Sequence, residues 1–388
     1  MVAPKFSAAR RGVARRAQEK ADRLIQSSSK DEQICLLPVA EFASALARQT
    51  EPGTFRMRVL KLFLLLALPA NFIFAATTGP DSLTVRNAHA MAYNHDRATV
   101  MLFGGADAET VREDLWEWNG KQWQQVPSDG PPPRTFPAMA YDRARHALVV
   151  YGGNRVLFGT ENDKDTFLAD HWEWKGADWQ QINVPTPPAR AEATMVYDEA
   201  RQRIVLFGGY RVLDGKGIRL NDTWEWDGEK WSQAGTSGPS PRNGAAMTYD
   251  PDRQRTILFG GSGASGETWE WHGTGWHEIK PALDEGLFNS AMTYDVKHRQ
   301  VIRFGGWNGE IRVGDTWAFD GKKWHRVVVT GPEARNHAAM AYDSKRQRVV
   351  LFGGHEGEKV FGDTWEWDGR RWSRATYTAA RMRIDNGH

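Results

Sequence analysis

Apolar and polar positions alternate in short blocks, and the same series of blocks returns six times between residues 86 and 376. One unit contains an apolar run such as "AMAYD", a polar turn such as "SKRQR", a second apolar run ending in two glycines, "VVLFGG", and the segment "DTWEWDGRRW". Short runs of β-branched and aromatic residues are typical of buried strands, and the polar segments between them are typical of turns. The pattern therefore predicts four short strands per unit.

The spacing within the units is nearly constant. The methionine of the first strand recurs at Met91, Met139, Met195, Met247, Met292 and Met340. Only the interval from the glycine pair to the first tryptophan changes, running 11, 19, 15, 8, 11 and 11 residues. That interval is the loop between the second and third strands. In a sheet of up-and-down strands, this loop and the connector to the next unit lie at the same end of the strands, here called the loop face. We expect function on the loop face, because variable loops on a fixed scaffold usually carry it.

This unit of about fifty residues, with a double glycine closing its second strand, resembles the kelch repeat. The resemblance implies an all-β, six-bladed kelch-type β-propeller over residues 80–376, with four antiparallel strands per blade. The first and sixth units each contain all four strands, so we expect the ring to close by packing, without strand exchange. Residues 82–86 or the tail are the candidates for an added edge strand.

Comparison with known kelch-type proteins limits the chemistry that this chain can perform. Galactose oxidase, whose central domain is of this type, uses a copper site with a cysteine-crosslinked tyrosine. The only cysteine here is Cys35, which precedes the repeats, so that cofactor cannot form. Bacterial sialic-acid mutarotases are similar in architecture, but no motif carries their site onto this chain. The partner domains of eukaryotic kelch adaptors are not visible in the sequence.

The tryptophans follow the repeat. Seventeen of the eighteen occupy equivalent positions, and Trp307 is the exception. Trp224 and Trp226 lie two apart on one strand and therefore face the same side, while Trp231 returns on the next strand. We expect each such trio to fill the seam between neighbouring blades, since large aromatic side chains suit a wide seam.

A repeated arginine and a repeated glutamate suggest a structural ion pair. Five units begin with arginine and carry glutamate between the two tryptophans, but the fifth unit has Leu287 and Ala318 at these positions. We therefore expect an Arg–Glu pair within each blade, as between Arg335 and Glu366. The acidic residue before the first tryptophan, such as Asp363, is the rival partner.

Candidate functional residues are those that depart from the repeat. A first ring, three residues before each methionine, consists of Ala88, Phe136, Glu192, Gly244, Asn289 and His337. A second ring, directly after each glycine pair, consists of Ala106, Asn154, Tyr210, Ser262, Trp307 and His355. From these rings and the residues beside them, the predicted binding residues are Trp307, Tyr210, Asn289, Arg303, Arg155 and Arg211. Glu192, His337 and His355 are the weaker catalytic candidates. For each of them an ordinary surface or structural role is the alternative.

Arg303 replaces a strand leucine and needs an acidic partner or an anionic ligand. His89, His337 and His355 would lie in neighbouring blades of a closed ring, but they match no metal-binding spacing. The acidic residues of the loop 159–167 match no ordered calcium loop. We therefore expect neither a metal nor another cofactor.

The segment before the repeats predicts export. Residues 1–56 carry ten basic and six acidic residues and are expected to have little order. Residues 57–76, "MRVLKLFLLLALPANFIFAA", have the basic start, apolar core and small-residue end of a signal peptide. Translation from Met57 would make residues 1–56 an artefact of gene-start assignment. The alternatives to a signal peptide are a buried strand and an uncleaved anchor. We expect a secreted or periplasmic location, no membrane span after cleavage, and a short tail at 377–388.

Residues 77–388 carry 38 basic and 42 acidic residues, which gives no reason to expect nucleic-acid binding. The sequence favours a monomeric, non-catalytic protein that binds a protein or glycan through the loop face. A sugar-modifying or isomerising enzyme at the channel mouth is the alternative, and a structural component of the cell envelope is a third possibility.

Overall fold

The structure is a computed structural model and describes residues 83–376 except 128, 157–165, 265 and 284. These residues form 24 strands and no helix. The strands of blades 1 to 3 are β1 (Ala90–Asn94), β2 (Thr99–Phe103), β3 (Leu115–Trp118), β4 (Trp123–Val126), β5 (Ala138–Asp142), β6 (Ala147–Tyr151), β7 (His171–Trp174), β8 (Trp179–Gln181), β9 (Thr194–Asp198), β10 (Arg203–Leu213), β11 (Lys216–Trp226) and β12 (Trp231–Gly235). Those of blades 4 to 6 are β13 (Ala246–Asp250), β14 (Arg255–Phe259), β15 (Thr268–Trp271), β16 (Trp276–Ile279), β17 (Ala291–Asp295), β18 (Gln300–Phe304), β19 (Thr316–Phe319), β20 (Trp324–Val327), β21 (Ala339–Asp343), β22 (Arg348–Phe352), β23 (Thr364–Trp367) and β24 (Trp372–Arg374).

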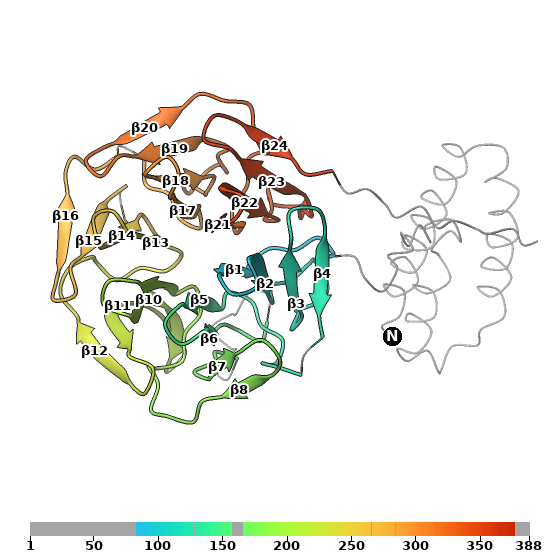
Figure 1. The fold of residues 1–388 in the computed structure, drawn as a ribbon. Helices are drawn as coiled ribbons and strands as arrows, with labels where there is room; N and C mark the ends of the chain where they lie inside the picture. The colour runs from blue at the N-terminus through green and yellow to red at the C-terminus, as the bar shows by residue number, and fades with distance from the viewer. Residues whose placement is uncertain (1–82, 128, 157–165, 265, 284, 377–388) are drawn as a thin grey trace, which may run out of the picture. The chain divides into compact units, whose positions relative to one another are not determined.

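The strands form six antiparallel sheets, each made of four consecutive strands, and the sheets surround a central axis as the blades of a propeller (Figure 1). The innermost strand of each blade contacts the innermost strand of both neighbouring blades, and β1 contacts β21 in the same way. No strand of blade 1 comes from the C-terminal end of the described chain. The predicted fold and the predicted closure by packing are therefore confirmed; residues 83–86 add no strand.

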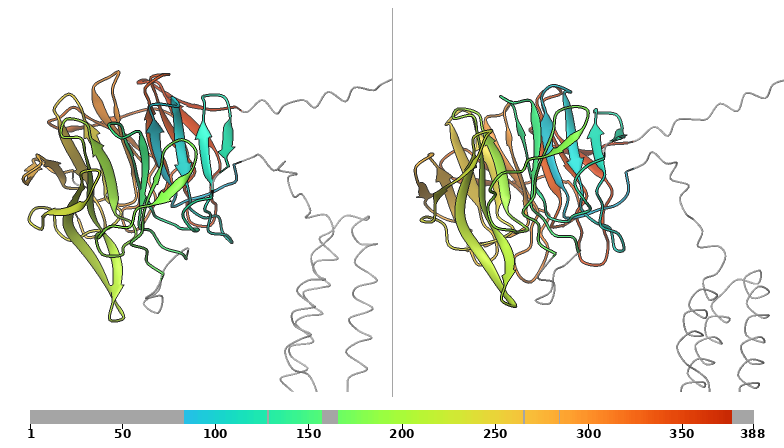
Figure 2. Two further views of the ribbon diagram at one scale, coloured as in Figure 1. Left: turned by 60° about the horizontal axis from the view of Figure 1, so that its bottom comes forward. Right: turned by 90° about the horizontal axis from the view of Figure 1, so that it is seen from below.

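In blade 3 the variable loop is itself a β-hairpin, because β10 and β11 are each eleven residues long. This hairpin projects beyond the other blades on the loop face (Figure 2). The tight turns between first and second strands lie at the opposite end of the propeller. There, tyrosines of the innermost strands bind the turn of the preceding blade, as when the Tyr249 hydroxyl accepts the amide of Ala200. Such bonds fasten one blade to the next.

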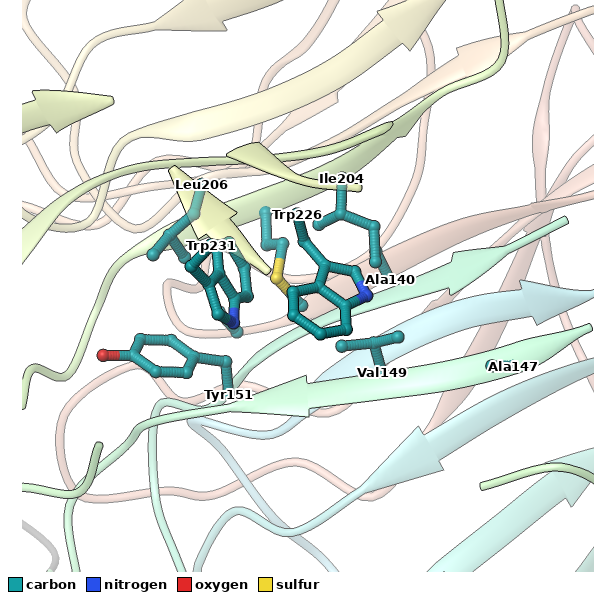
Figure 3. Close-up of a cluster of buried hydrophobic side chains, with 10 residues drawn as sticks. Ala140, Ala147, Val149, Tyr151, Ile204, Leu206, Trp226 and Trp231 are labelled. Carbon is teal, nitrogen blue, oxygen red and sulfur yellow. The ribbon is translucent and has the colours of Figure 1, made fainter. Parts of the chain in front are cut away.

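The tryptophans fill the seams as predicted. Between blades 2 and 3, Trp226 and Trp231 pack on Val149 and Tyr151 of the neighbouring sheet (Figure 3). The Tyr151 and Trp231 rings lie 5.5 Å apart, and Trp226 is only 1% exposed. Because an aromatic side chain buries roughly 150–250 Å², these seams account for much of the apolar area that the propeller hides. The tryptophan repeat is structural.

The predicted Arg–Glu pair is wrong. The arginine that opens a blade binds the acidic residue before the first tryptophan, as Arg335 binds Asp363 at 2.6 Å. The glutamate between the tryptophans binds an arginine of the first turn, as Glu366 binds Arg346. Glu366 also accepts the indole N–H of Trp118 at 3.0 Å, across the seam that closes the ring. The alternative partner of the arginine, the acidic residue before the first tryptophan, is therefore the correct one.

Arg303 lies inside blade 5 and is 0% exposed. Its Nη1 donates to the Gly305 carbonyl at 3.2 Å. The arginines that open the other five blades bind the equivalent glycine carbonyl, as Arg335 does on Gly353 at 3.0 Å. Arg303 thus supplies from the strand the guanidinium that Leu287 cannot supply. This position supports a structural role and leaves Arg303 unexposed to a ligand.

Candidate functional site

The mouth of the central channel on the loop face is a closed backbone ring. All six first-ring residues have φ between 52° and 61°. The amide of each one donates to the carbonyl of its counterpart in the preceding blade: Ala88 to His337 (3.1 Å), Phe136 to Ala88 (2.7 Å), Glu192 to Phe136 (3.4 Å), Gly244 to Glu192 (3.1 Å), Asn289 to Gly244 (2.7 Å) and His337 to Asn289 (3.0 Å). The ring uses its own backbone donors and acceptors, so side chains supply the chemistry of the mouth.

Two side-chain groups gather at this mouth. On one side, the Phe136 and His337 rings meet edge to face at 5.0 Å, across the small Ala88. On the other side, Glu192 accepts hydrogen bonds from Asn243, at 2.7 Å, and from Asn289. Asn289 extends over Gly244, where a Cβ would collide with its Oδ1. The sequence-predicted Glu192, Asn289 and His337 therefore do belong to one mouth.

His355 of the second ring joins His337 by a hydrogen bond of 2.8 Å. The Gly357 amide donates to His355 Nδ1 at 3.2 Å, which places the His355 proton on Nε2. That proton is then donated to His337 Nδ1, so His337 carries its own proton on Nε2. Burial, followed by His355 and Arg312, lowers the pKa of His337 to about 3. Burial and Arg312 lower the pKa of His355 as well. Both rings are therefore neutral at pH 7.

Below the ring lies a cavity of about 190 Å³, here called the chamber. All six first-ring residues line it, together with the start of the innermost strands. Burial raises the pKa of Glu192 despite its amide hydrogen bonds. His89 also lines the chamber and is 7% exposed. Burial and Arg86 lower the pKa of His89 to about 3, against a smaller opposing effect of the Phe352 carbonyl.

The second ring lies outside the first and does not line the chamber. In five blades its backbone forms a bridge with the residue before the first-ring position, as between Trp307 and Phe288. Trp307 also packs on Phe288 at 5.1 Å. Tyr210 packs on Phe167 at 5.8 Å. The two rings are thus concentric, and His355 provides their side-chain contact at blade 6.

The second ring is part of two matching clusters that the sequence analysis missed. In blade 5, Arg312 pairs with Trp307 across the loop, its guanidinium 5.5 Å from the Trp307 ring, and it donates to Asn336 of blade 6 at 3.1 Å. In blade 3, Arg219 pairs with Tyr210 and donates to Asn243 of blade 4 at 3.0 Å.

A spacing signal for these clusters is present in the sequence. Arg219 and Arg312 each lie five residues before the first tryptophan of their blade. The equivalent positions in the other blades hold Val111, Phe167, Ala264 and Val360. Counting from the glycine pair hides the match, because the loop of blade 3 is four residues longer than that of blade 5.

The other predicted binding residues have different surroundings. Arg155 is exposed, and its backbone pairs with Thr166. Arg211 is half-buried on the β10 extension, opposite Ile218. Most of the acidic loop lies outside the described residues. Within those residues no group of three or more His, Cys, Asp and Glu side chains is arranged to hold a metal ion. The described chain also contains no helix with the length and apolar character needed to cross a membrane.

Comparisons with known proteins support the fold and no family. No protein-family model matches the chain. It is 33% identical over 138 residues to "Dynein alpha chain, flagellar outer arm" and 33% over 137 residues to "Dynein regulatory complex subunit 7", both of Chlamydomonas reinhardtii. These matches cover 32% of this chain each, but 3% and 11% of those proteins. "Mei4-dependent protein 6" of Schizosaccharomyces pombe is 26% identical over 199 residues, which is 45% of this chain and 28% of that protein.

The chain therefore spans less than a third of these curated relatives. Among solved structures, "Structure of YjhT" matches with a TM-score of 0.59 and 16% identity, covering 76% of this chain and 99% of that chain. A likeness at this identity shows the propeller fold alone.

Proposed function

We propose that this chain is an exported propeller of kelch type that binds a glycan through its loop face without catalysing a reaction. The observation that carries the proposal is the pair of matching clusters, Trp307 with Arg312 and Tyr210 with Arg219. In each, an arginine that donates to an asparagine of the next blade is the strand partner of a half-buried aromatic residue, and in blade 5 the guanidinium lies 5.5 Å from the Trp307 ring. Two such clusters beside one mouth, on blades 3 and 5 with blade 4 between them, are suited to separate units of a repeating ligand.

The surface between the clusters favours a glycan over a folded protein partner. Specific protein interfaces usually have an apolar centre. On the loop face the large exposed hydrophobic side chains among the described residues are Val85, Leu213, Ile311 and Val328, which are spread over blades 1, 3 and 5. Aromatic planes flanked by fixed N–H donors can instead stack on a sugar ring and bind its hydroxyl groups. A protein partner remains an outcome of the binding test.

An acid–base enzyme acting on a sugar is the second candidate. The observation that favours it is Glu192, whose raised pKa and position at the mouth suit a proton-transferring group. His337, which lines the same chamber, is neutral and offers an N–H donor. Turnover of a bound sugar, followed by NMR of its anomeric or epimeric forms, would support this candidate; unchanged sugar after prolonged incubation would count against it.

Export is proposed from residues 57–76, which lie outside the described residues. The six repeats with their glycine pairs support the kelch type. N-terminal sequencing of the native protein from a periplasmic or culture fraction should place the mature start close to residue 77. Recovery of a peptide from residues 1–55 would contradict translation from Met57.

The binding proposal is tested with an array of neutral and acidic oligosaccharides, followed by calorimetry on those retained. Trp307→Ala and Arg312→Ala should each weaken binding of a retained glycan about tenfold or more, because one cluster is lost. Arg299→Ala is the matched control, since Arg299 is an exposed arginine paired with Asp252 on the opposite face. Retention of no glycan, or equal weakening by the control, would overturn the proposal.

A further inference from the structure

The end of the propeller opposite the loop face, here called the turn face, carries an uneven charge. Each blade presents two tight turns there, an inner turn after its first strand and an outer turn after its third. Nine lysines and arginines and four acidic residues occupy the turns of blades 5 and 6, which are residues 295–300, 320–323, 343–348 and 368–371. Five basic and six acidic residues occupy the equivalent turns of blades 3 and 4, which are residues 198–203, 227–230, 250–255 and 272–275. Positive charge is therefore concentrated on two neighbouring blades.

The acidic residues of the blade 5 and blade 6 turns do not neutralise this charge. Each of the four already has a partner: Asp295 binds His298, Asp343 binds Arg346, and Asp320 and Asp368 accept backbone amides of their own turns. Within the described part of the chain, five exposed cations of these turns form no ion pair with a carboxylate: Lys297, Lys322, Lys323, Lys345 and Arg370.

The fold does not need a cation at these positions. Lys297 and Lys345 occupy one repeat position, five residues after the methionine, where the other blades have Asp96, Ala144, Ala200 and Asp252. The outer turns vary in the same way, since the place of Lys322 and Lys323 is taken in blade 4 by Thr274 and Gly275. The cations are thus a departure from the repeat that is confined to one side of the turn face.

The turns of blades 5 and 6 form one continuous and level surface. A Cβ at Gly369 would collide with the His298 imidazole, so the outer turn of blade 6 packs on the inner turn of blade 5. Gly120 packs on Arg346 in the same way and adds the exposed Lys121 of blade 1. The turns have equal lengths in all six blades, whereas the loops vary and the blade 3 hairpin projects from the opposite end (Figure 2). The cations consequently lie at about one level.

This arrangement fits an extended anionic plane better than a small anion. The five cations are spread over inner and outer turns, and none of them lines either axial cavity, so they do not converge on one ligand. The phosphates of an anionic bilayer attract each lysine or arginine that comes close to its surface, and the contributions accumulate. Val296, the large hydrophobic side chain exposed on this face among the described residues, lies beside Lys297 and can contact the lipid interface.

We propose that the turn face of blades 5 and 6 binds the surface of an anionic lipid bilayer through the headgroup phosphates. In this orientation the loop face points away from the bilayer and stays open to a glycan. The inference goes beyond the proposed function and does not depend on it, because the two surfaces lie at opposite ends of the propeller.

The first test measures co-flotation of the purified full-length chain with vesicles of phosphatidylcholine, alone or mixed with phosphatidylglycerol. Binding to the anionic vesicles should be at least about tenfold tighter, and high salt should remove the difference, since exposed charges are screened. The variants Lys322→Glu/Lys323→Glu and Lys297→Glu/Lys345→Glu should each weaken anionic-vesicle binding about tenfold or more. The control Lys216→Glu/Lys230→Glu makes the same change in net charge at exposed lysines of blade 3 and should have little effect.

A second test remains decisive even if residues 57–76 attach the chain to every vesicle. Acetylation of the vesicle-bound chain, read by mass spectrometry, should be slower on anionic than on neutral vesicles at Lys297, Lys322, Lys323 and Lys345. Lys216 and Lys230 should react equally on both.

The proposal fails if those four lysines react equally on both kinds of vesicle, or if the control double variant weakens binding as much as the others. It also fails if the chain binds the soluble polyanion heparin but not the anionic vesicles. Trp307→Ala should leave vesicle binding unchanged, so failure of the glycan proposal would leave this one intact.

Discussion

Exchanging the residues at positions 287 and 303 should stabilise the propeller. In blade 6, Arg335 binds the Gly353 carbonyl and both carboxylate oxygens of Asp363. In blade 5, Arg303 binds the Gly305 carbonyl, while its Nε and Nη2 have no partner. The double variant Leu287→Arg/Arg303→Leu would return blade 5 to the arrangement of the other blades, with Asp315 as the carboxylate.

The magnitude follows from the burial of Arg303. Burial lowers the pKa of Arg303 from 12.5 to about 10, which corresponds to roughly 3 kcal/mol for keeping the charge inside at neutral pH. Nearby Phe259 and Trp317 rings offset part of this cost through cation–π contacts. Asp315 is now bound to the exposed Arg326, a contact worth little. We therefore expect the double variant to gain about 2–3 kcal/mol in its free energy of unfolding.

The single variants make the test specific. Leu287→Arg alone should destabilise the fold by several kcal/mol, because two guanidinium groups would compete for one buried carbonyl. Arg303→Leu alone should have a small effect, since the relieved charge offsets the lost hydrogen bond. Urea unfolding followed by tryptophan fluorescence and circular dichroism measures all three. A double variant less stable than the natural chain, or a tolerated Leu287→Arg, would refute the idea that Arg303 is the displaced repeat arginine.

Two further predictions concern acid stability and the seam that closes the ring. Burial lowers the pKa of His89 and of His337 from 6.5 to about 3 in the folded protein, so both contribute stability above pH 6.5 that is lost as pH falls toward 3. His337→Asn should therefore reduce the loss of unfolding free energy between pH 7 and pH 3, measured from unfolding curves at each pH. An unchanged pH dependence would contradict the burial argument. Trp118→Phe removes the indole N–H bound to Glu366 and should cost about 1–3 kcal/mol. The loss should be smaller when Trp118→Phe is made in a Glu366→Ala background, which has no acceptor, and an equal loss there would show that the hydrogen bond is not the cause.

The fold could be predicted because one sequence pattern was repeated six times at fixed spacing. Seam packing depends on which face of the sheet a side chain occupies. Side chains alternate between the two faces along a strand, so the sequence assigns Trp224 and Trp226 to one face and Glu225 to the other. Glu225 does face the next seam, where it accepts the indole N–H of Trp271 at 3.0 Å. Local periodicity was sufficient for these features.

The ion pairs could not be predicted the same way, because partner choice depends on distances across strands. The simultaneous loss at Leu287 and Ala318 suggested one pair, but it reflects two separate substitutions. Arg303 replaces the arginine missing at Leu287. His298 occupies the turn position whose arginine binds the glutamate in four other blades, so Ala318 leaves no turn arginine unpaired there. A single simultaneous loss cannot distinguish these two cases.

The candidate site could be located but not assembled from the sequence. Departure from the repeat identified Glu192, Asn289 and His337 at the mouth, since the fold leaves these positions free to vary. The contact of His337 with His355 and the clustering of Glu192 with Asn243 depend on the closed ring, which brings together residues of different blades. Arg312 was missed because the loops were aligned from their glycine pairs.

The backbone conformation of the first ring affects how its side chains are interpreted. Every first-ring residue has a left-handed conformation, which costs a residue other than glycine about 1 kcal/mol or more. Gly244 shows that glycine fits this ring, and the hydrogen bonds that close it involve only backbone atoms. The turn residues at the opposite face share this conformation without being glycine: Ala98, His146, Gln202, Gln254, Arg299 and Gln347. A left-handed residue other than glycine is therefore a general feature of the repeat and is not by itself a sign of function. What distinguishes Phe136, Glu192 and His337 is that their side chains make contacts at the mouth between different blades, which offset the cost of the conformation.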